Sequence, residues 1–379
     1  MKITDVRTIR ASRYLFTEVE TDSGIVGLGE SGTWGFLDAS EAAIRQFGRY
    51  LVGQDPLRIE HHWNYMYRAH HFRGAAIMGA LSAVDIALWD IAGKHFGVPV
   101  WQLLGGKVRD RARTYFHVKA RTTEEMVAGC LSAKEAGFTA VGHLSPFLDE
   151  PKSDPYFETH ARKIGRAADR VRRYREAVGD EVDLCIEIHR RLKPAEAIAL
   201  ATEIEPYHPF FYEDPVKPDN LDAMEQVARK IRIPIATGER LHTIAEFEML
   251  LKRMAVDYVR PDVCMAGGIS HTKKIAALAE AHDAMVVPHN PIGPVSTAAC
   301  VQIAACIPNF ALQEYNHIES AADAEKLVKR PLELAGGFLI VPERPGIGVE
   351  LEDGIAERYP PREQSVRARL ATDGSVVDQ

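Results

Sequence analysis

Three short apolar runs each end in a glutamate: DLCIE at residues 183–187, PFFYE at 209–213 and IPIATGE at 233–239. Glu187 and Glu213 are 26 residues apart, and so are Glu213 and Glu239. A strand, a turn and a helix together take about that many residues in a βα unit. Because the parallel strands of a barrel end at one rim, successive units would bring the three carboxylates together. Three carboxylates that converge on one point are typical of a Mg²⁺ site.

The composition is that of a globular protein with room for two domains. The 379 residues suit a barrel of roughly 250 residues and a smaller domain. A net charge of −7 gives no reason to expect nucleic acid as a partner. We find no apolar run near the ~20 residues that a membrane span requires, and we expect no membrane partner. The five cysteines lie mostly inside apolar runs, which favours a reducing cytoplasm over a disulfide framework.

The first hundred residues have a different pattern from the rest. Residues 15–30 are typical of a β-hairpin, with alternating apolar residues on both sides of a turn. Helical patterns follow over about 39–51, 60–70 and 74–96. Strands followed by helices predict an α+β domain, which we place at residues 1–110.

From about residue 112, strand-like runs alternate with helical stretches. The strands are predicted to end near His117, Leu144, His189, Asp214, Glu239, Asp262, His289 and Glu314. Eight such runs favour a parallel α/β barrel over an open sheet, and we place this barrel at residues 111–335. The tail from about 336 to 379 is rich in Gly and Pro near its start, and we expect it to complete the first domain.

Acids and histidines gather at these strand ends, where the active site of a parallel barrel lies. They include Glu187, His189, Glu213, Glu239, Arg240, Asp262, His289 and Glu314. Each has a structural alternative, because an acid after a strand often caps the next helix and a lone histidine is often a structural hydrogen bonder. Because three glutamates fall at the ends of three successive strands, a shared role in a functional site is favoured over three separate helix caps. Asp262 and His289 end adjacent strands at matching depth, so Asp262 is predicted to orient His289 and raise its basicity.

Several motifs in the barrel resemble those of the enolase superfamily. They are FYEDP at 211–215, TGER at 237–240, RPD at 260–262, AGGI at 266–269, PHNPIGP at 288–294 and QEY at 313–315. The first domain resembles that family too, through AVDIALWDIAGK at 83–94 and QLLGG at 102–106. The nearest branch is the mandelate-racemase-like group of sugar-acid dehydratases, of the galactonate dehydratase type. The resemblance implies a modified TIM barrel, (β/α)₇β, under an α+β capping domain.

The resemblance also implies a metal and a substrate. Mg²⁺ would be held by Glu187, Glu213 and Glu239, and the substrate would be an aldonate whose carboxylate binds that metal. The first step would remove the proton α to the carboxylate, and Mg²⁺ would stabilise the charge of the resulting enediolate.

Roles for the remaining residues follow from the same resemblance. His289, oriented by Asp262, would be the base at C2, and His189 would protonate the departing 3-hydroxyl. Glu314 would hydrogen-bond the substrate carboxylate. The enol product would then ketonise to a 2-keto-3-deoxy acid.

Two departures from the family pattern affect this scheme. The third-strand ligand is usually Asp, and here it is Glu187, whose extra methylene moves the carboxylate by about a bond length. Many racemases carry a Lys-x-Lys pair at the second strand, whereas residues 141–145 read VGHLS. The missing lysines disfavour two-base racemisation and favour dehydration by histidines.

Four residues are candidate substrate contacts: Trp34, Arg73, His143 and Arg240. Trp34 lies in the loop after the hairpin and is a candidate lid, although a packed tryptophan fits the sequence equally well. His143 has an equally good structural interpretation.

Two alternatives to a dehydratase remain open at this stage. One is an epimerase or racemase on the same scaffold, which would return a proton to C2. The other is a barrel that binds a sugar acid with little turnover. This alternative stays open because Glu187 replaces the Asp that is usual at the third-strand ligand position. The resemblance also suggests a homo-oligomer.

Overall fold

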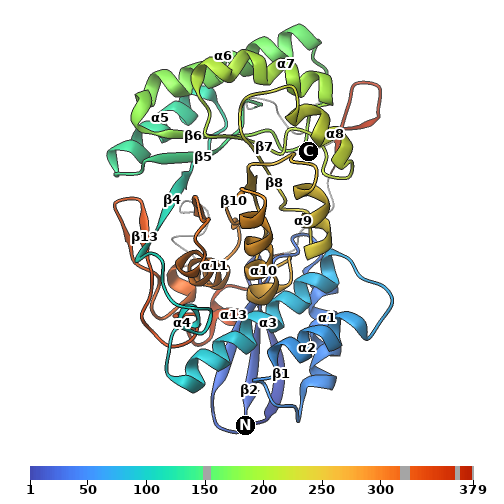
Figure 1. Ribbon diagram of the computed structural model, residues 1–379, viewed down its shortest axis with the longest axis vertical. Coiled ribbons are helices and arrows are strands. Elements are labelled where there is room, and N and C mark those ends of the chain that lie inside the picture. The colour runs from blue at the N-terminus through green and yellow to red at the C-terminus, as the bar shows by residue number, and fades with distance from the viewer. Residues whose placement is uncertain (148–154, 316–324, 363–367, 378–379) are drawn as a thin grey trace.

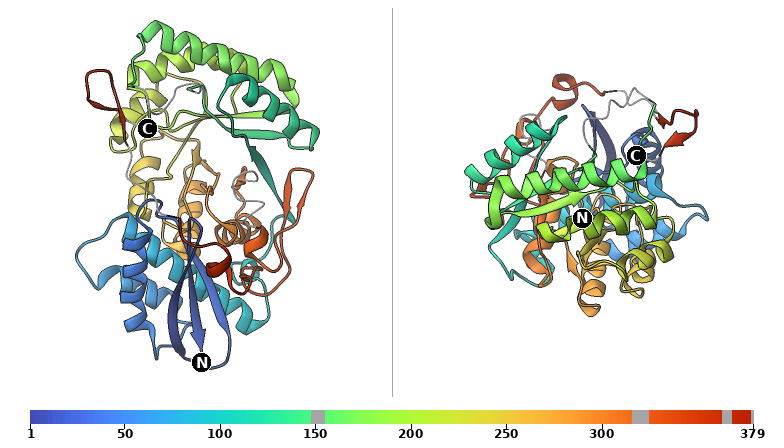
Figure 2. Two further views of the ribbon diagram at one scale, coloured as in Figure 1. Left: turned by 180° about the vertical axis from the view of Figure 1, so that it is seen from behind. Right: turned by 90° about the horizontal axis from the view of Figure 1, so that it is seen from above.

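The computed structural model describes residues 1–147, 155–315, 325–362 and 368–377 of the chain (Figure 1). It has two parts, an N-terminal α+β domain and a ring of parallel strands surrounded by helices. Seen from the front and from behind, the N-terminal domain lies at one end of the molecule, and the helices α5 to α7 lie at the other (Figures 1 and 2).

The N-terminal domain is a three-stranded antiparallel sheet packed against helices. Its elements are β1 (Ile3–Ala11), β2 (Tyr14–Thr21), β3 (Val26–Ser31), α1 (Leu37–Leu51), α2 (Ile59–Arg68), α3 (Ala75–Phe96) and the short α4 (Val100–Leu103). The hairpin and the three long helices match the sequence-based expectation. Strand β1 was not predicted, because only its two end residues are buried and its middle carries charged and polar side chains.

Helix α3 corrects one expectation. We expected no apolar run near the length of a membrane span, yet α3 has 22 residues and is long and apolar enough to cross a membrane. Most of it is buried inside the protein, because 78% of its most apolar stretch is buried. Helix α3 packs directly against strand β3. A Cβ added to Gly27 of β3 would lie 2.1 Å from a backbone oxygen of α3, and one added to Gly29 would lie 1.8 Å from another, so only glycine leaves room for the helix. Helix α3 is thus a core helix of this domain.

Eight parallel strands form the second part: β4 (Arg111–His117), β5 (Ala140–Leu144), β6 (Asp183–Glu187), β7 (Phe211–Glu213), β8 (Ile235–Thr237), β9 (Tyr258–Val259), β10 (Met285–Val286) and β11 (Gln313–Tyr315). The strands from β4 to β10 pair in chain order, and β11 pairs with β4. Between β10 and β11, the Val286 N–H donates to Asn309 O (2.8 Å) and the Ala311 N–H donates to Val286 O (3.0 Å). These bonds complete the ring.

Helices cover the outside of the ring: α5 (Thr123–Glu135), α6 (His160–Val178), α7 (Pro194–Ile204), α8 (Leu221–Ala228), α9 (Ile244–Leu251), α10 (Gly268–Ala281) and α11 (Pro294–Cys306). Several of these helices begin at residues that favour a helix N-terminus. Thr122 forms a capping box with Glu125, Asn220 and Thr243 accept backbone N–H groups, and Pro294 occupies the first turn of α11. The predicted fold class, a (β/α)₇β barrel with an α+β capping domain, is confirmed.

The tail after the barrel contacts both parts of the molecule. Strands β12 (Leu334–Ala335) and β13 (Phe338–Ile340) form a hairpin that pairs antiparallel to β4. Residues 346–362 then run along the N-terminal domain, where α13 (Ile355–Arg358) lies near β1 and the Ser12 N–H donates to Tyr359 O (2.7 Å). The last hairpin, β14 (Arg369–Leu370) and β15 (Val376–Val377), contacts Tyr156 of the barrel.

Candidate active site at the barrel mouth

Seven buried hydrophobic residues on or next to the barrel strands form one cluster: Tyr115, Ala140, Cys185, Phe211, Ala236, Val287 and Leu312. Five of these residues lie two positions before a polar residue at a strand end: His117, Glu187, Glu213, His289 and Glu314. Side chains two positions apart along a strand point to the same face. The polar residues therefore form the next layer up, at the mouth of the barrel.

The N-terminal domain covers part of this mouth. The Gly32 N–H donates to Cys264 O (3.2 Å), and Arg13 Nη2 donates to Pro291 O (2.9 Å). Cys264 and Pro291 follow β9 and β10, so the tips of the N-terminal sheet lie against the loops that leave the barrel there.

The three glutamates occupy neighbouring strand ends. Glu187 and Glu213 are paired residues of β6 and β7, and Glu239 lies two residues after β8. Burial and the nearby carboxylates of Glu239 and Asp214 raise the pKa of Glu187 to about 8. Burial also raises the pKa of Glu213 well above its usual range. The pKa of Glu239, by contrast, is lowered to about 2, because His289 and Arg190 lie close to it and outweigh its burial. Among the described residues, the donor atoms that lie within 4.8 Å of one another are those of His143, Glu187 and His189, so a metal held by all three glutamates is a proposal.

Two arginines also form ion pairs with acids of this rim, and the sequence did not predict either ion pair. Arg260, only 1% exposed, forms ion pairs with Glu213 (2.5 Å) and Glu314 (2.6 Å). Arg190 forms ion pairs with Asp214 (3.0 Å) and with Glu239. Arg260 lies inside the RPD motif, which could have indicated its role. No signal in the sequence shows that Arg190 turns inward, since its left-handed backbone (φ 64°) is a feature of the fold.

His289 and Asp262 form a hydrogen-bonded pair. His289 Nδ1 lies 2.8 Å from Asp262 Oδ2, and Asp262 is fully buried. On its other side, His289 Nε2 lies 3.3 Å from Glu239 Oε2. Burial alone would lower the pKa of His289, but the carboxylates of Glu239 and Asp262 outweigh it and raise that pKa to about 9. The pair places a basic imidazole beside the row of glutamates.

A second group of histidines lies at the other end of that row. The His189 N–H donates to Glu187 Oε1 (2.7 Å), and its ring nitrogen Nε2 lies 3.9 Å from Glu187 Oε2. Its ring centroid lies 4.9 Å from that of His143, and the ring of His143 stacks on His117 at 4.2 Å. Burial lowers the pKa of all three, that of His143 to about 4. These rings are therefore neutral at pH 7.

His117 belongs to this group but was absent from the predicted site. It ends β4 and is 3% exposed, and its Nε2 lies 3.7 Å from Glu314 Oε1. Its position at a predicted strand end was the available signal.

The predicted substrate contacts are placed differently. His143 lies in the histidine group, and the ring of Trp34 lies 5.0 Å from the guanidinium of Arg13, which itself reaches the loop after His289. Arg73 stacks on Tyr67 of α2 (4.1 Å), and Arg240 points to Asp219 (3.9 Å). Neither of these last two contacts is with an acid or histidine at a strand end.

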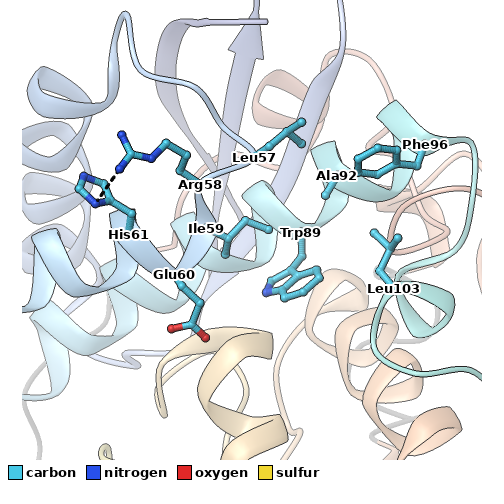
Figure 3. Close-up of a pocket in the computed structure, with 9 residues that line it drawn as sticks. All are labelled: Leu57, Arg58, Ile59, Glu60, His61, Trp89, Ala92, Phe96 and Leu103. Atoms are coloured by element: carbon cyan, nitrogen blue, oxygen red, sulfur yellow. Dashed lines mark hydrogen bonds between the residues drawn. The ribbon is translucent and has the colours of Figure 1, made fainter.

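A separate pocket of about 500 Å³ lies on the N-terminal domain, between α2, α3 and α4 (Figure 3). Apolar residues such as Ile59, Trp89 and Phe96 line it together with the polar Arg58, Glu60 and His61 (Figure 3). No predicted site residue contributes to this pocket.

Comparisons with known proteins agree with this geometry. Residues 2–105 match the family "Mandelate racemase / muconate lactonizing enzyme, N-terminal domain", and residues 125–355 match "Enolase C-terminal domain-like". The chain is 38% identical over 362 residues to the D-galactonate dehydratases of Verminephrobacter eiseniae and Ralstonia pickettii, covering 94% of this chain and 93% of each relative.

Solved structures show the same relationship. An enolase from Agrobacterium radiobacter, solved with bound Na and L-malate, has a TM-score of 0.92, 32% identity and full coverage of both chains. A mandelate racemase/muconate lactonizing enzyme-like protein from Roseovarius sp. TM1035 has a TM-score of 0.89 and 34% identity, again over both full chains. The chain therefore belongs to the enolase superfamily, in its mandelate-racemase-like branch.

Proposed function

We propose that this protein is a hydro-lyase that dehydrates an aldonic acid to a 2-keto-3-deoxy acid with the help of Mg²⁺. The observation that carries this proposal is the placement of two histidines at opposite ends of one row of glutamates. His289 contacts Glu239 at one end, and His189 contacts Glu187 at the other. Dehydration needs both a base for C2 and an acid for the 3-hydroxyl, and this arrangement provides two separate groups. The two D-galactonate dehydratases support the same class of reaction.

His289 is the proposed base. Asp262 accepts a hydrogen bond from Nδ1, which leaves Nε2 as the nitrogen that takes the proton from C2. A base must be unprotonated, and in the metal-free protein the carboxylates of Glu239 and Asp262 raise the pKa of His289 to about 9. Binding of Mg²⁺ by Glu239 would weaken the stabilisation that this carboxylate gives to the imidazolium, and the role of base requires His289 to lose its proton then. When bound by Glu187, Glu213 and Glu239, Mg²⁺ would supply positive charge that stabilises the negative charge growing on the substrate carboxylate.

His189 is the proposed acid. Burial and the neighbouring His143 lower the pKa of His189, so it is neutral in the free protein. The negative charge of a bound sugar acid favours the imidazolium form, and we expect His189 to gain its proton as the substrate binds. It then gives that proton to the leaving 3-hydroxyl. The C2–H and C3–O bonds break, water leaves, and the enol that forms ketonises.

Glu314 is the proposed contact for the substrate carboxylate, and a hydrogen bond between the two carboxyl groups requires a proton on one of them. Its Oε2 accepts hydrogen bonds from Arg260 Nη2 (2.6 Å) and from the Asn290 N–H (2.8 Å). Its Oε1 faces His117 at 3.7 Å, and we propose that this atom faces the substrate. Trp34, Arg73, His143 and Arg240 remain proposed substrate contacts. We also propose a homo-oligomer, and a cytoplasmic location that the five buried free cysteines favour.

The test is a substrate screen. The purified protein with Mg²⁺ is incubated with four- to six-carbon aldonates of every configuration, beginning with D-galactonate, and semicarbazide detects 2-keto-3-deoxy product. Product formation establishes dehydration and identifies the substrate. Exchange of the C2 proton without a keto product would point instead to an epimerase. Saturable binding with neither exchange nor product would point to a binding protein.

A further inference from the structure

A carboxylate of the N-terminal domain binds the helix that follows the proposed base. Glu30, near the end of β3, is fully buried, and its two oxygens accept the backbone N–H groups of Gly293 and Ser296, each at 2.9 Å. These N–H groups belong to the N-cap and first turn of α11, where donors lack partners within the helix. The approach is close, since a Cβ on Gly293 would lie 2.3 Å from Glu30 Oε1.

The segment from Asn290 to Ser296 starts directly after His289, and the N-terminal domain holds it at more than one point. Arg13, in the turn between β1 and β2, donates to Pro291 O (2.9 Å). The Asn290 N–H donates to Glu314 at 2.8 Å. Only a few residues separate His289 from the contacts at Asn290, Pro291 and Gly293. A shift of α11 would therefore also move the imidazole of His289.

The loop after Asp262 is held in the same manner. Asp85 of α3 accepts the Ser270 N–H (3.0 Å) and the Ser270 hydroxyl (2.6 Å) in the first turn of α10. Just before it, the Gly267 N–H donates to the Ser82 hydroxyl (2.9 Å), and Trp63 Nε1 donates to Gly267 O (2.9 Å). Asp85 is itself buried, with 1% exposure. The N-terminal domain therefore contacts both loops that leave the His289–Asp262 pair.

We infer that Glu30 and Asp85 are positioning residues, which fix the first turns of α11 and α10 and thereby the relative placement of His289 and Asp262. The inference rests on the proposed role of that pair in the dehydratase reaction. Catalysis is sensitive to such placement, because an error of ~1 Å in a reacting group can cost on the order of 10²-fold in rate. Glu30 also directly precedes the loop that carries Trp34, so it joins a proposed substrate contact to the base.

Glu30→Gln is the direct test. The glutamine keeps the size of the side chain, but its amide NH₂ faces a backbone N–H and cannot accept from it. We expect kcat, and C2 proton exchange in D₂O, to fall by about 10-fold or more, while KM changes by less than about 3-fold. If the Glu30 contact only stabilised the fold, Glu30→Gln would lower the melting temperature but would not lower kcat at nearly constant KM.

Asp90→Asn is the matched control. Asp90 is also a fully buried acid of the N-terminal domain that accepts two backbone N–H groups, from Leu28 and Ile347, each at 2.9 Å. Neither donor lies in α10, α11 or the loops before them. Asp90 differs from Glu30 in also forming an ion pair with Lys94 (2.7 Å). We expect Asp90→Asn to lower the melting temperature at least as much as Glu30→Gln, because it also breaks the ion pair with Lys94, while kcat stays within about 3-fold of the wild-type value. Equal loss of kcat in the two variants would overturn the inference.

A second measurement does not depend on the substrate. Backbone hydrogen exchange over residues 289–297, followed by mass spectrometry, should speed up in Glu30→Gln and stay unchanged in Asp90→Asn. Unchanged protection in Glu30→Gln would overturn the inference even if no aldonate is ever found to react. If Glu30→Gln does not fold, Gly293→Ala disturbs the same contact from the other side and is expected to give the same results.

Discussion

At the scale of single residues, the two histidines are distinguished by their neighbours. His289 lies between two carboxylates, which raise its pKa to about 9, whereas His189 lies beside another imidazole and has a lowered pKa. In the metal-free protein His289 is therefore protonated at pH 7 and His189 is neutral, and the proposed roles require both protonation states to change when metal and substrate bind. The proposed assignment can therefore be tested one residue at a time.

Replacing His289 by Asn should remove the base. We expect C2 proton exchange in D₂O to fall by about 10²-fold or more, because general-base catalysis typically contributes that much. Exchange is measured by NMR on the substrate that the screen identifies. Exchange at the wild-type rate would exclude His289 as the base.

Replacing His189 by Asn should separate the two steps. Dehydration should fall by about 10²-fold, because the 3-hydroxyl leaves without a proton donor, while C2 exchange is retained in part. Keto product and exchange are measured on the same sample. Parallel loss of both would contradict a separate acid role for His189. His160→Asn, at the start of α6, serves as a control for loss of a histidine outside the site.

At the scale of elements, the site depends on where neighbouring strands end. Glu187 and Glu213 are paired residues of β6 and β7, and Glu239 follows β8, so one rim of the sheet carries all three. The spacing of 26 residues between these glutamates predicted that they would follow successive strands, and they do. Mg²⁺ binding by these carboxylates remains a proposal, and protein stability offers a direct test.

Mg²⁺ should raise the melting temperature of the protein by a few degrees. A ligand that binds only the folded state at 100 times its Kd stabilises that state by about 2.7 kcal/mol. Differential scanning fluorimetry with and without Mg²⁺ measures the shift. Glu213→Gln should abolish it, and Asp353→Asn, which changes a highly exposed acid, should leave it intact. A shift that survives Glu213→Gln would contradict the proposed ligand set.

The elements also show what the sequence could and could not predict. Alternation of strands and helices identified all eight barrel strands and their polar ends, because burial patterns are local. The ion pairs of Arg190 and Arg260 were missed, since they depend on which long side chains turn inward once the ring has closed. Arg73 and Arg240 were selected by position alone, and their described contacts are with Tyr67 and Asp219. Strand β1 was missed because most of its side chains are not buried.

At the scale of the whole molecule, buried acids join the two parts. Burial raises the pKa of Glu30 to about 8 and that of Asp85 to about 7, against the opposing effect of their hydrogen bonds. An acid whose pKa is higher in the folded state contributes most stability below its unfolded pKa. That contribution is lost as the pH rises through the folded value.

The Glu30 contribution should therefore decline between about pH 4.5 and pH 8. Glu30→Gln cannot ionise, so the stability advantage of the wild type over this variant should shrink as the pH rises across this window. The limiting slope for one proton is about 1.4 kcal/mol per pH unit. Urea unfolding of both proteins at several pH values measures the difference. A constant difference would show that Glu30 is ionised throughout the window.

The return of the tail to the N-terminal domain has a consequence for the order of assembly during synthesis. The turn between β1 and β2 is bound by residues near 359–362, through Ser12, and α3 is bound near Ile347, through Asp90. The N-terminal domain of residues 1–110 can thus make these contacts only after all eight barrel strands have been synthesised. Until then, the part of its surface that the tail covers stays exposed to solvent and to chaperones, and a chain that ends after β11 would carry its barrel under a cap that lacks these contacts.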